Sequence, residues 1–214
     1  VALLLIPDCR LLTLTGLGGC GKTRLAIELA NALAAQFPHG ALFVALQPIP
    51  RAELLASAIA QVVGLTSDSE AQPHEQLLAY FQDKTALLIL DNFEHLLDGA
   101  TFVSDLLAAA RGVTVLATSR EALRLQEEWL YPLGGLQTPP SVYATSMEGY
   151  EAVQLFLSHA RRVQPGFDLA AEHEAVVRIC MMTAGLPLAL ELAASWLKGL
   201  RATHIAQAMH RTLE

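Results

Sequence analysis

Charge is scarce in this chain of 214 residues: only 16% of them are Asp, Glu, Lys or Arg, while 53% are hydrophobic. A disordered chain has the opposite balance, so the composition excludes intrinsic disorder. Long apolar runs are also missing. The longest, such as Val1–Ile6 and Ala86–Leu90, are far shorter than the about 18 residues that a membrane span needs. Runs of this length are typical of parallel strands buried on both faces, which predicts an α/β protein with no membrane partner.

Basic residues and cysteines are few as well. The chain has 14 Lys and Arg against 21 Asp and Glu, a formal net charge of −7. Binding to a nucleic-acid backbone needs a basic surface, so we expect no direct nucleic-acid binding by this segment. The three cysteines, Cys9, Cys20 and Cys180, lack the spacing of a disulfide framework or a zinc site. They fit a reducing compartment, and we expect a cytoplasmic protein.

Short apolar runs alternate with helical patterns in the first two thirds of the chain. The predicted strands are Leu11–Thr15, Ala41–Leu46, Ala86–Leu90, Val113–Thr118 and Trp129–Leu133. The predicted helices between them carry apolar stripes at Ala26–Phe37, Leu55–Val62 and Phe102–Ala109. This alternation predicts βαβ units, and hence a parallel five-stranded sheet flanked by helices.

The pattern changes after residue 137. Gly134-Gly135 and Thr138–Ser141 indicate a linker, and the stripes beyond them are all helical. One of these stripes begins at Pro187 and includes Trp196, which we expect in a helical core together with Phe156. We therefore predict a P-loop nucleotide-binding α/β domain at 1–137, a linker at 138–147 and a small all-α domain at 148–214. The chain begins with Val rather than Met, and we expect it to be an incomplete module of a larger protein.

The most informative motif is Gly16–Thr23, which matches G-x-x-x-x-G-K-[ST] between a predicted strand and a predicted helix. Glycines let successive backbone N–H groups converge on a phosphate, and the helix directs its positive end at the same group. Lys22 adds a cation at the β- and γ-phosphates, and Thr23 offers a hydroxyl to Mg²⁺. The predicted nucleotide contacts here are Gly16, Gly18, Gly19, Cys20, Gly21, Lys22, Thr23 and Arg24.

A second motif is the apolar strand that ends in Asp91. A P-loop requires a carboxylate on a neighbouring strand end to hold the Mg²⁺ shell, so we predict Thr23 and Asp91 as the metal-binding residues. Many P-loop ATPases place a second carboxylate next to this Asp, but Asn92 occupies that position. Glu94 is the nearest acid and is either the activator of the attacking water or a surface or capping residue on the next helix. We assign a structural role to His95.

A third motif is Ser119-Arg120 at the end of a predicted strand. Ligands of open α/β sheets bind at the carboxyl ends of the strands, so Arg120 could reach a terminal phosphate. An Arg after a strand is often simply solvated, and that alternative stays open at this point. Arg124 is a weaker candidate.

Taken in order, four motifs resemble one family. They are Gly16–Thr23, Leu87–Leu96, Thr118–Glu121 and Gly185–Ala194. Together they resemble the STAND class of signal-transduction ATPases, of NB-ARC type, and in particular the nucleotide-binding module of large bacterial transcriptional regulators with LuxR-type or SARP-type DNA-binding domains.

The resemblance implies a molecular switch that binds ATP or ADP, with flanking effector and sensor domains in the same polypeptide and nucleotide-dependent self-association. It implies that Arg120 contacts the terminal phosphate and that Pro187 packs near the adenine. It also implies that the helical domain closes over the nucleotide. In the family, an adenine-contacting segment precedes the P-loop strand, and a winged-helix domain follows the helical domain.

Three functions follow from these motifs. The first is an ATP/ADP switch with slow Mg²⁺-dependent hydrolysis, in which Lys22, Arg120 and Glu94 act on the phosphates or the water. The second is a nucleotide-binding scaffold that does not hydrolyse ATP, suggested by Asn92. The third is a P-loop small-molecule kinase, which the helical C-terminal third disfavours. An AAA+ motor is disfavoured because Gly185–Pro187 stands where a sensing Arg is expected.

Overall fold

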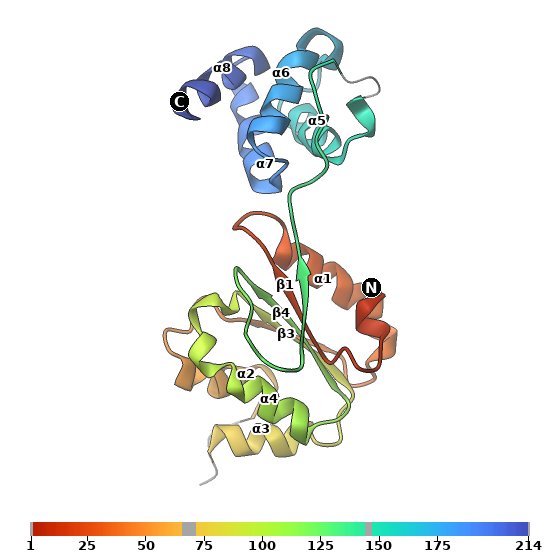
Figure 1. The fold of residues 1–214 in the computed structure, drawn as a ribbon, viewed down its shortest axis with the longest axis vertical. Coiled ribbons are helices and arrows are strands. Elements are labelled where there is room, and N and C mark those ends of the chain that lie inside the picture. Colours follow the sequence, from red (N-terminus) through yellow and green to blue (C-terminus); the bar gives the residue numbers. More distant parts are fainter. Residues whose placement is uncertain (1, 66–71, 144–146, 214) are drawn as a thin grey trace. The chain divides into compact units, whose positions relative to one another are not determined.

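The computed structural model describes residues 2–65, 72–143 and 147–213 and divides into two compact units (Figure 1). We call Val1–Gly16 with Lys22–Leu133 the sheet unit, and Leu17–Gly21 with Gly134–Glu214 the helical unit. The predicted linker, 138–147, includes residues 144–146, which lie outside the described residues. The predicted domain boundaries stay a proposal.

The sheet unit is built on five parallel strands in the order β2-β3-β4-β1-β5. The strands are β1 (Leu11–Thr15), β2 (Ala41–Ala45), β3 (Ala86–Asp91), β4 (Val113–Ser119) and β5 (Glu128–Pro132). The prediction of a parallel five-stranded sheet flanked by helices is thereby confirmed, and each observed strand overlaps a predicted one.

Helices cover both faces of this sheet (Figure 1). Its helices are α1 (Lys22–Leu33), α2 (Leu55–Val62), α3 (Pro73–Phe81) and α4 (Thr101–Ala109). Leu88 and Leu90 of β3 pack in one core with α2, α3 and α4, while the alternate residues Leu87 and Ile89 pack in a second core with α1. Because successive side chains of a strand point to opposite faces, burial of both faces requires an unbroken apolar run.

Two helices of the sheet unit differ from the sequence analysis. α3 was not predicted; it begins with Pro73 at its first turn and buries Leu77 and Phe81. The predicted stripe through Phe37 is also too long: α1 ends at Leu33, and a short 3₁₀ turn follows at Ala34–Gln36. Phe37 lies just beyond that turn and is still buried.

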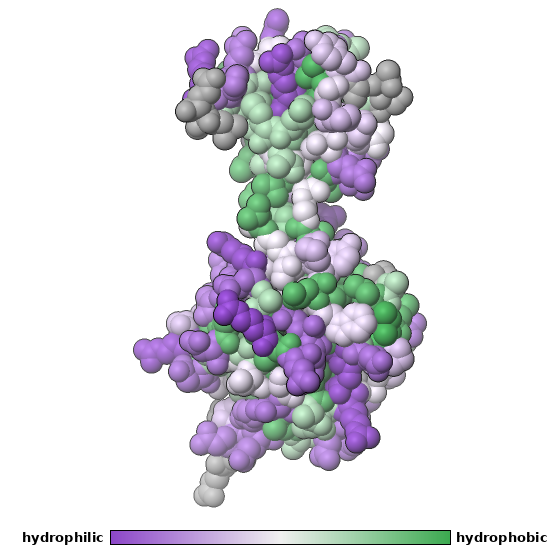
Figure 2. Space-filling view, in the orientation of Figure 1, coloured by the Kyte–Doolittle hydropathy of each residue, from purple (hydrophilic) through white to green (hydrophobic). Residues whose placement is uncertain are grey.

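The edge strand β5 is less buried than the central strands. Trp129, Leu130 and Tyr131 are 37%, 52% and 44% exposed. Figure 2 shows hydrophobic and hydrophilic side chains together on the face in view. Part of the high apolar content therefore lies at the surface rather than in the core.

The helical unit contains α5 (Glu151–Val163), α6 (Leu169–Met182), α7 (Pro187–Ser195) and α8 (Ala202–Leu213) around a core of its own. Phe156 is fully buried in it, as predicted. The prediction for Trp196 is wrong, because this residue is 49% exposed. Every turn of α7 carries apolar residues on more than one face, so the periodicity of apolar residues could not show which face is buried.

The face of α7 that packs in the core is offset from the predicted stripe. Its buried residues are Leu190, Ala193 and Ala194, with Leu197 in the following turn. Leu188 and Leu192, by contrast, are 51% and 54% exposed.

The side chain of Arg10 holds the turn between α4 and β4 by hydrogen bonds. Its guanidinium donates hydrogen bonds to the backbone oxygens of Leu107 (2.7 Å), Val113 (2.9 and 3.2 Å) and Ala110. The side chain thus satisfies carbonyls at the end of α4 that the helix itself leaves unpaired. Burial, with the nearby charge of Arg111, lowers the pKa of Arg10.

We expect Arg10→Met to lower the free energy of unfolding of the sheet unit by about 2–4 kcal/mol, because Met keeps the apolar stem and leaves the carbonyls unsatisfied. The measurement is urea unfolding in a Trp196→Phe background, in which Trp129 is the remaining tryptophan and reports on the sheet unit. Arg111→Met, at an exposed neighbouring arginine, is the control. Equal unfolding midpoints for the two variants would contradict this role of Arg10.

Candidate functional site

The loop between β1 and α1 is shaped by glycine. Gly19 and Gly21 have φ angles of 79° and 99°, which side-chain-bearing residues rarely adopt. α1 begins directly after the loop, at Lys22. The Lys22 Nζ donates a hydrogen bond to the backbone oxygen of Gly16 over 2.8 Å. The ammonium is therefore held back toward the start of the loop, beside the amino end of a 12-residue helix.

Asp91 joins three segments at the carboxyl edge of the sheet. Its Oδ1 accepts a hydrogen bond from the Thr23 hydroxyl (2.7 Å) and another from the Thr118 hydroxyl (2.6 Å). Thr118 in turn accepts a hydrogen bond from the backbone N–H of Asn92 (2.9 Å) and is 1% exposed. The predicted metal residues Thr23 and Asp91 are thus in direct contact.

Thr118 is a positioning residue that the sequence analysis did not assign. Its place at the end of an apolar strand, just before Ser119-Arg120, was visible in the sequence. A threonine there is also what β-propensity favours, so the pattern did not distinguish packing from hydrogen bonding.

The chemistry of these donors fits Mg²⁺. A hydroxyl and a carboxylate are hard oxygen ligands, and Mg²⁺ usually takes one or two such protein groups, with phosphates and waters completing its shell. In the part of the chain that the structure describes, no group of three or more His, Cys, Asp or Glu could hold a metal ion by itself. Any Mg²⁺ at Thr23 and Asp91 would therefore depend on oxygens from a ligand.

Glu94 and Arg120 form an ion pair. The Arg120 Nε lies 3.0 Å from Glu94 Oε1, and the side chains are 70% and 16% exposed, respectively. Glu94 lies in a 3₁₀ turn (Phe93–His95) that Asn92 starts with a left-handed φ of 68°. The alternative of a solvated surface residue does not describe Glu94, which is largely buried. Its role toward water stays a prediction.

His95 connects this turn to the segment after β2. Its Nε2 lies 3.1 Å from the backbone oxygen of Leu46 and 2.9 Å from that of Ile49. Two carbonyl partners require Nε2 to carry the proton, which leaves Nδ1 as acceptor for the Asn92 amide at 3.5 Å. This geometry suits the structural role that the sequence analysis assigned.

The hydrogen bonds and ion pairs described above do not include Arg24, Arg124 or Pro187. Arg24 is 85% exposed and pairs with Glu28 at 3.6 Å within α1. Pro187 is the first residue of α7 in the helical unit, and its role near the base stays a prediction. Arg124, the weaker cationic candidate, pairs with Glu121 at 3.2 Å.

Gly185, two residues before Pro187, has a structural reason of its own. Its φ is 68°, and its backbone oxygen accepts a hydrogen bond from Leu136 N–H over 2.8 Å. A Cβ at this position would come within 2.0 Å of the Leu136 oxygen. Close packing within the helical unit therefore demands glycine here.

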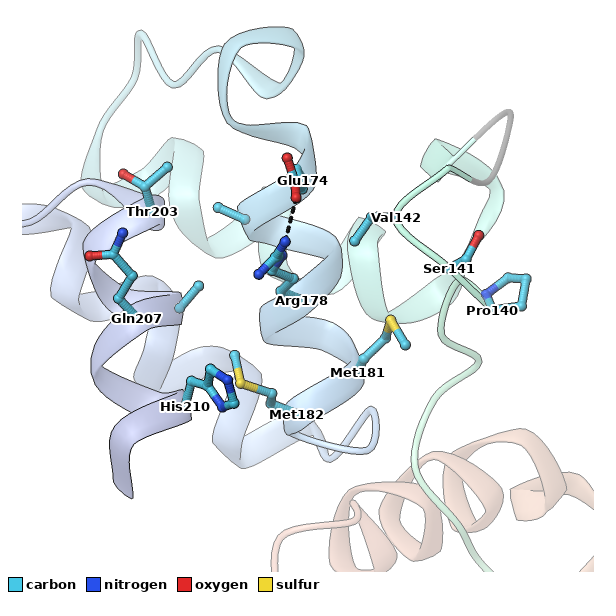
Figure 3. A pocket seen from close by; sticks show the side chains of 12 residues that line it. Pro140, Ser141, Val142, Glu174, Arg178, Met181, Met182, Thr203, Gln207 and His210 are labelled. Atoms are coloured by element: carbon cyan, nitrogen blue, oxygen red, sulfur yellow. Dashed lines mark hydrogen bonds and ion pairs between the residues drawn. The ribbon is translucent and has the colours of Figure 1, made fainter. Parts of the chain in front are cut away.

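The helical unit contains a cavity of about 660 Å³, and Figure 3 shows the side chains that line it. Its lining comes from residues 140–142, α6 and the α8 segment, and includes the ion pair Glu174–Arg178 and two methionines, Met181 and Met182. The predicted phosphate and metal ligands do not line it, so this cavity is not the site that the motifs describe.

Comparison with known proteins identifies a family whose model matches this chain. The model of the AAA domain matches residues 7–125, a range that holds Lys22, Asp91, Glu94 and Arg120. The match does not reach Gly185–Pro187, so it leaves the expectation about an AAA+ motor untested.

Two curated relatives are named as regulators. An HTH-type transcriptional regulator of Mycobacterium tuberculosis is 39% identical over 207 residues, which cover 96% of this chain and 22% of the regulator. The regulatory protein AfsR of Streptomyces griseus is 28% identical over 194 residues, which cover 87% of this chain and 18% of AfsR. The chain thus spans about a fifth of the length of these relatives.

Among solved structures, a signal transduction ATPase with numerous domains (STAND) from Pyrococcus horikoshii, which has a tetratricopeptide repeat sensor, has a similar fold. The TM-score is 0.54 at 17% identity, and the alignment covers 100% of this chain and 32% of that protein. This likeness concerns the fold alone. The regulator relatives confirm the resemblance to a module of bacterial regulators; the STAND class and the NB-ARC type stay predictions. Within the described residues, no helix is long and apolar enough to cross a bilayer.

We expect Thr118→Val to weaken the apparent Mg²⁺ affinity, measured by Mg²⁺ titration in the presence of ATP, about tenfold. The hydroxyl that orients Asp91 is lost while the shape is kept, and loss of such an orienting group typically costs this much. Thr114→Val, the same change at a half-buried position of β4, should leave the titration unchanged. Superimposable curves for wild type and Thr118→Val would contradict the positioning role.

Proposed function

The chain belongs to the AAA domain family, and on that basis we propose that it is an ATP- and ADP-binding switch module of a transcriptional regulator, with slow Mg²⁺-dependent ATP hydrolysis. The observation that carries the proposal is the contact of Thr23 with Asp91 beside a glycine-shaped loop that ends in Lys22. These groups come from two different strand ends, and together they are what a nucleotide triphosphate with Mg²⁺ requires.

The loop residues would bind the phosphates. Their N–H groups and the amino end of α1 favour an anion, and the Lys22 ammonium would exchange the Gly16 oxygen for phosphate oxygens. Gly18 and Cys20, within the same loop, would contribute backbone N–H groups. Because the lysine already has an acceptor, binding replaces one hydrogen bond by stronger charge-assisted ones.

Thr23 and Asp91 would hold Mg²⁺, which neutralises developing charge on the phosphates when bound. In the described structure the two side chains bond to each other, so their oxygens already face a common point. Thr118 keeps Asp91 oriented from the other side.

Hydrolysis would proceed by attack of a water oxygen on the γ-phosphorus, with cleavage of the bond between that phosphorus and the oxygen that bridges to the β-phosphate. The products are ADP and inorganic phosphate. Glu94 is the candidate acceptor of the water proton, because Asn92 is a poor base. Arg120 would stabilise charge on the terminal phosphate.

A non-hydrolysing scaffold is the second candidate. Two observations favour it: the residue next to Asp91 is Asn92, and Oε1 of Glu94 is occupied by Arg120. Both leave the attacking water without a ready base, and both agree with a slow rate if hydrolysis occurs.

The switch would use the rest of the polypeptide. We place Pro187 near the base and assign the helical domain to closure over the nucleotide, as in NB-ARC modules. Flanking effector and sensor domains would read that closure, and nucleotide-dependent self-association would follow from it. DNA binding would belong to another part of the regulator, acting in the cytoplasm.

We expect Lys22→Ala to weaken binding of both ATP and ADP by roughly 30- to 100-fold, because charge-assisted hydrogen bonds to phosphate are lost. Isothermal titration calorimetry measures both affinities. Lys198→Ala, which removes the same charge from the helical unit, should change neither. Unaltered affinity in Lys22→Ala would refute the assignment of the loop.

Single-turnover assays with Mg²⁺ and radiolabelled ATP test hydrolysis. We expect the wild type to form ADP over minutes to hours and Lys22→Ala to form none above the protein-free blank. If the protein binds ATP but forms no ADP within a day, the slow-ATPase proposal is wrong and the non-hydrolysing scaffold takes its place.

A further inference from the structure

The two members of the Glu94–Arg120 pair differ in exposure. Glu94 is largely buried on a turn that is closed by a hydrogen bond from Leu96 N–H to the Phe93 oxygen, with Phe93 fully buried beneath. Arg120 is 70% exposed along its side chain and follows the last residue of β4. The arginine is therefore the partner that can leave.

The carboxylate of Glu94 is only partly satisfied. Its Oε1 accepts the Arg120 Nε, while Oε2 is buried and has no hydrogen-bond partner among the residues that the structure describes. A buried, unpaired carboxylate oxygen is costly, and in native proteins it calls for an explanation. The packing of the turn thus leaves Arg120 as the described partner of this carboxylate.

The other acid near Arg120 is already engaged. Glu121 Oε2 lies 3.2 Å from Arg124 Nη2, and the backbone of Arg124 is held by Glu128. Any other anion that binds Arg120 must therefore compete with Glu94 for its guanidinium.

A terminal phosphate is a stronger competitor than this carboxylate. It offers three oxygens and up to two charges to a planar guanidinium, whereas Glu94 offers one oxygen. ADP lacks that group, and its β-phosphate would already be enclosed by the loop.

We propose that the Glu94–Arg120 pair sets the preference of the site between ADP and ATP: Glu94 retains Arg120 unless a γ-phosphate displaces it. This inference rests on the proposed function. Glu94 is then a positioning residue for Arg120. ATP must break the intact pair when it binds, and this cost lowers ATP affinity; ADP leaves the pair in place and does not meet the cost. The pair therefore shifts the resting state toward ADP.

The test compares the dissociation constants of ADP and of a non-hydrolysable ATP analogue by calorimetry. Glu94→Gln keeps the size of the side chain and removes its charge. We expect the analogue to bind about fivefold tighter, as for loss of a partly exposed ion pair, and ADP to bind as before. Glu121→Gln, the same charge change one residue from Arg120, should leave the ratio of the two constants unchanged.

The mechanism is tested by repeating the substitution without the arginine. Arg120→Ala should weaken the analogue and spare ADP, and Glu94→Gln added to Arg120→Ala should have no further effect on the ratio. A general electrostatic effect of Glu94 would persist in the Arg120→Ala background and would overturn the proposal. So would an unchanged ratio in Glu94→Gln.

Folding is checked by thermal melting, and Glu94→Asp, which is charged but too short for the pair, serves as the second variant, with the same expected direction. If the wild type bound neither nucleotide, the proposed function would fail and this inference with it. Binding of both nucleotides with ratios insensitive to Glu94 would overturn this inference alone.

Discussion

Burial of the central strands on both faces is the constraint on which the rest of the sheet unit depends. Most residues of β1, β3 and β4 are buried, so their backbone N–H and C=O groups must pair with neighbouring strands. Successive parallel strands need helical crossovers, and these crossovers supply the covering layers. Polar side chains can then gather only where the strands end. The glycine-rich loop begins at the carboxyl end of β1, and Asp91 and Arg120 lie at those of β3 and β4, for this reason.

The polar groups at this edge already have partners in the protein. Lys22 bonds to the Gly16 oxygen, Asp91 to Thr23 and Thr118, and Glu94 to Arg120. Ligand binding at such a site is an exchange of partners rather than a first pairing, and differences between two ligands then depend on which protein pair each must break. In this view, discrimination of ATP from ADP comes from the exposed Arg120, which would leave Glu94 for the γ-phosphate.

The strands and the phosphate loop could be predicted because each has a local pattern: an unbroken apolar run, or glycines at fixed spacing before Lys22. The pairing of Asp91 with Thr23 was expected from the P-loop motif, but the expected neighbouring strand was wrong, because β4 lies between β1 and β3. Thr118 and the burial of Glu94 could not be predicted, since a hydroxyl in a strand and an acid in a turn have no periodic signal. α3 was missed although Pro73, Leu77 and Phe81 have helical spacing, because the stripe is short. The buried face of α7 could not be selected from an all-apolar helix.

The central claim is that Lys22, Thr23 and Asp91 hold the phosphates and Mg²⁺ of a nucleotide and that Arg120 binds the terminal phosphate when it is present. A crystal structure of the protein with Mg²⁺ and a non-hydrolysable ATP analogue tests it most directly. The account predicts the phosphates within the loop, Lys22 moved from the Gly16 oxygen to phosphate oxygens, Mg²⁺ at Thr23, and Arg120 moved from Glu94 to the γ-phosphate. Nucleotide bound elsewhere, or within the loop with Lys22 still on Gly16, would contradict it.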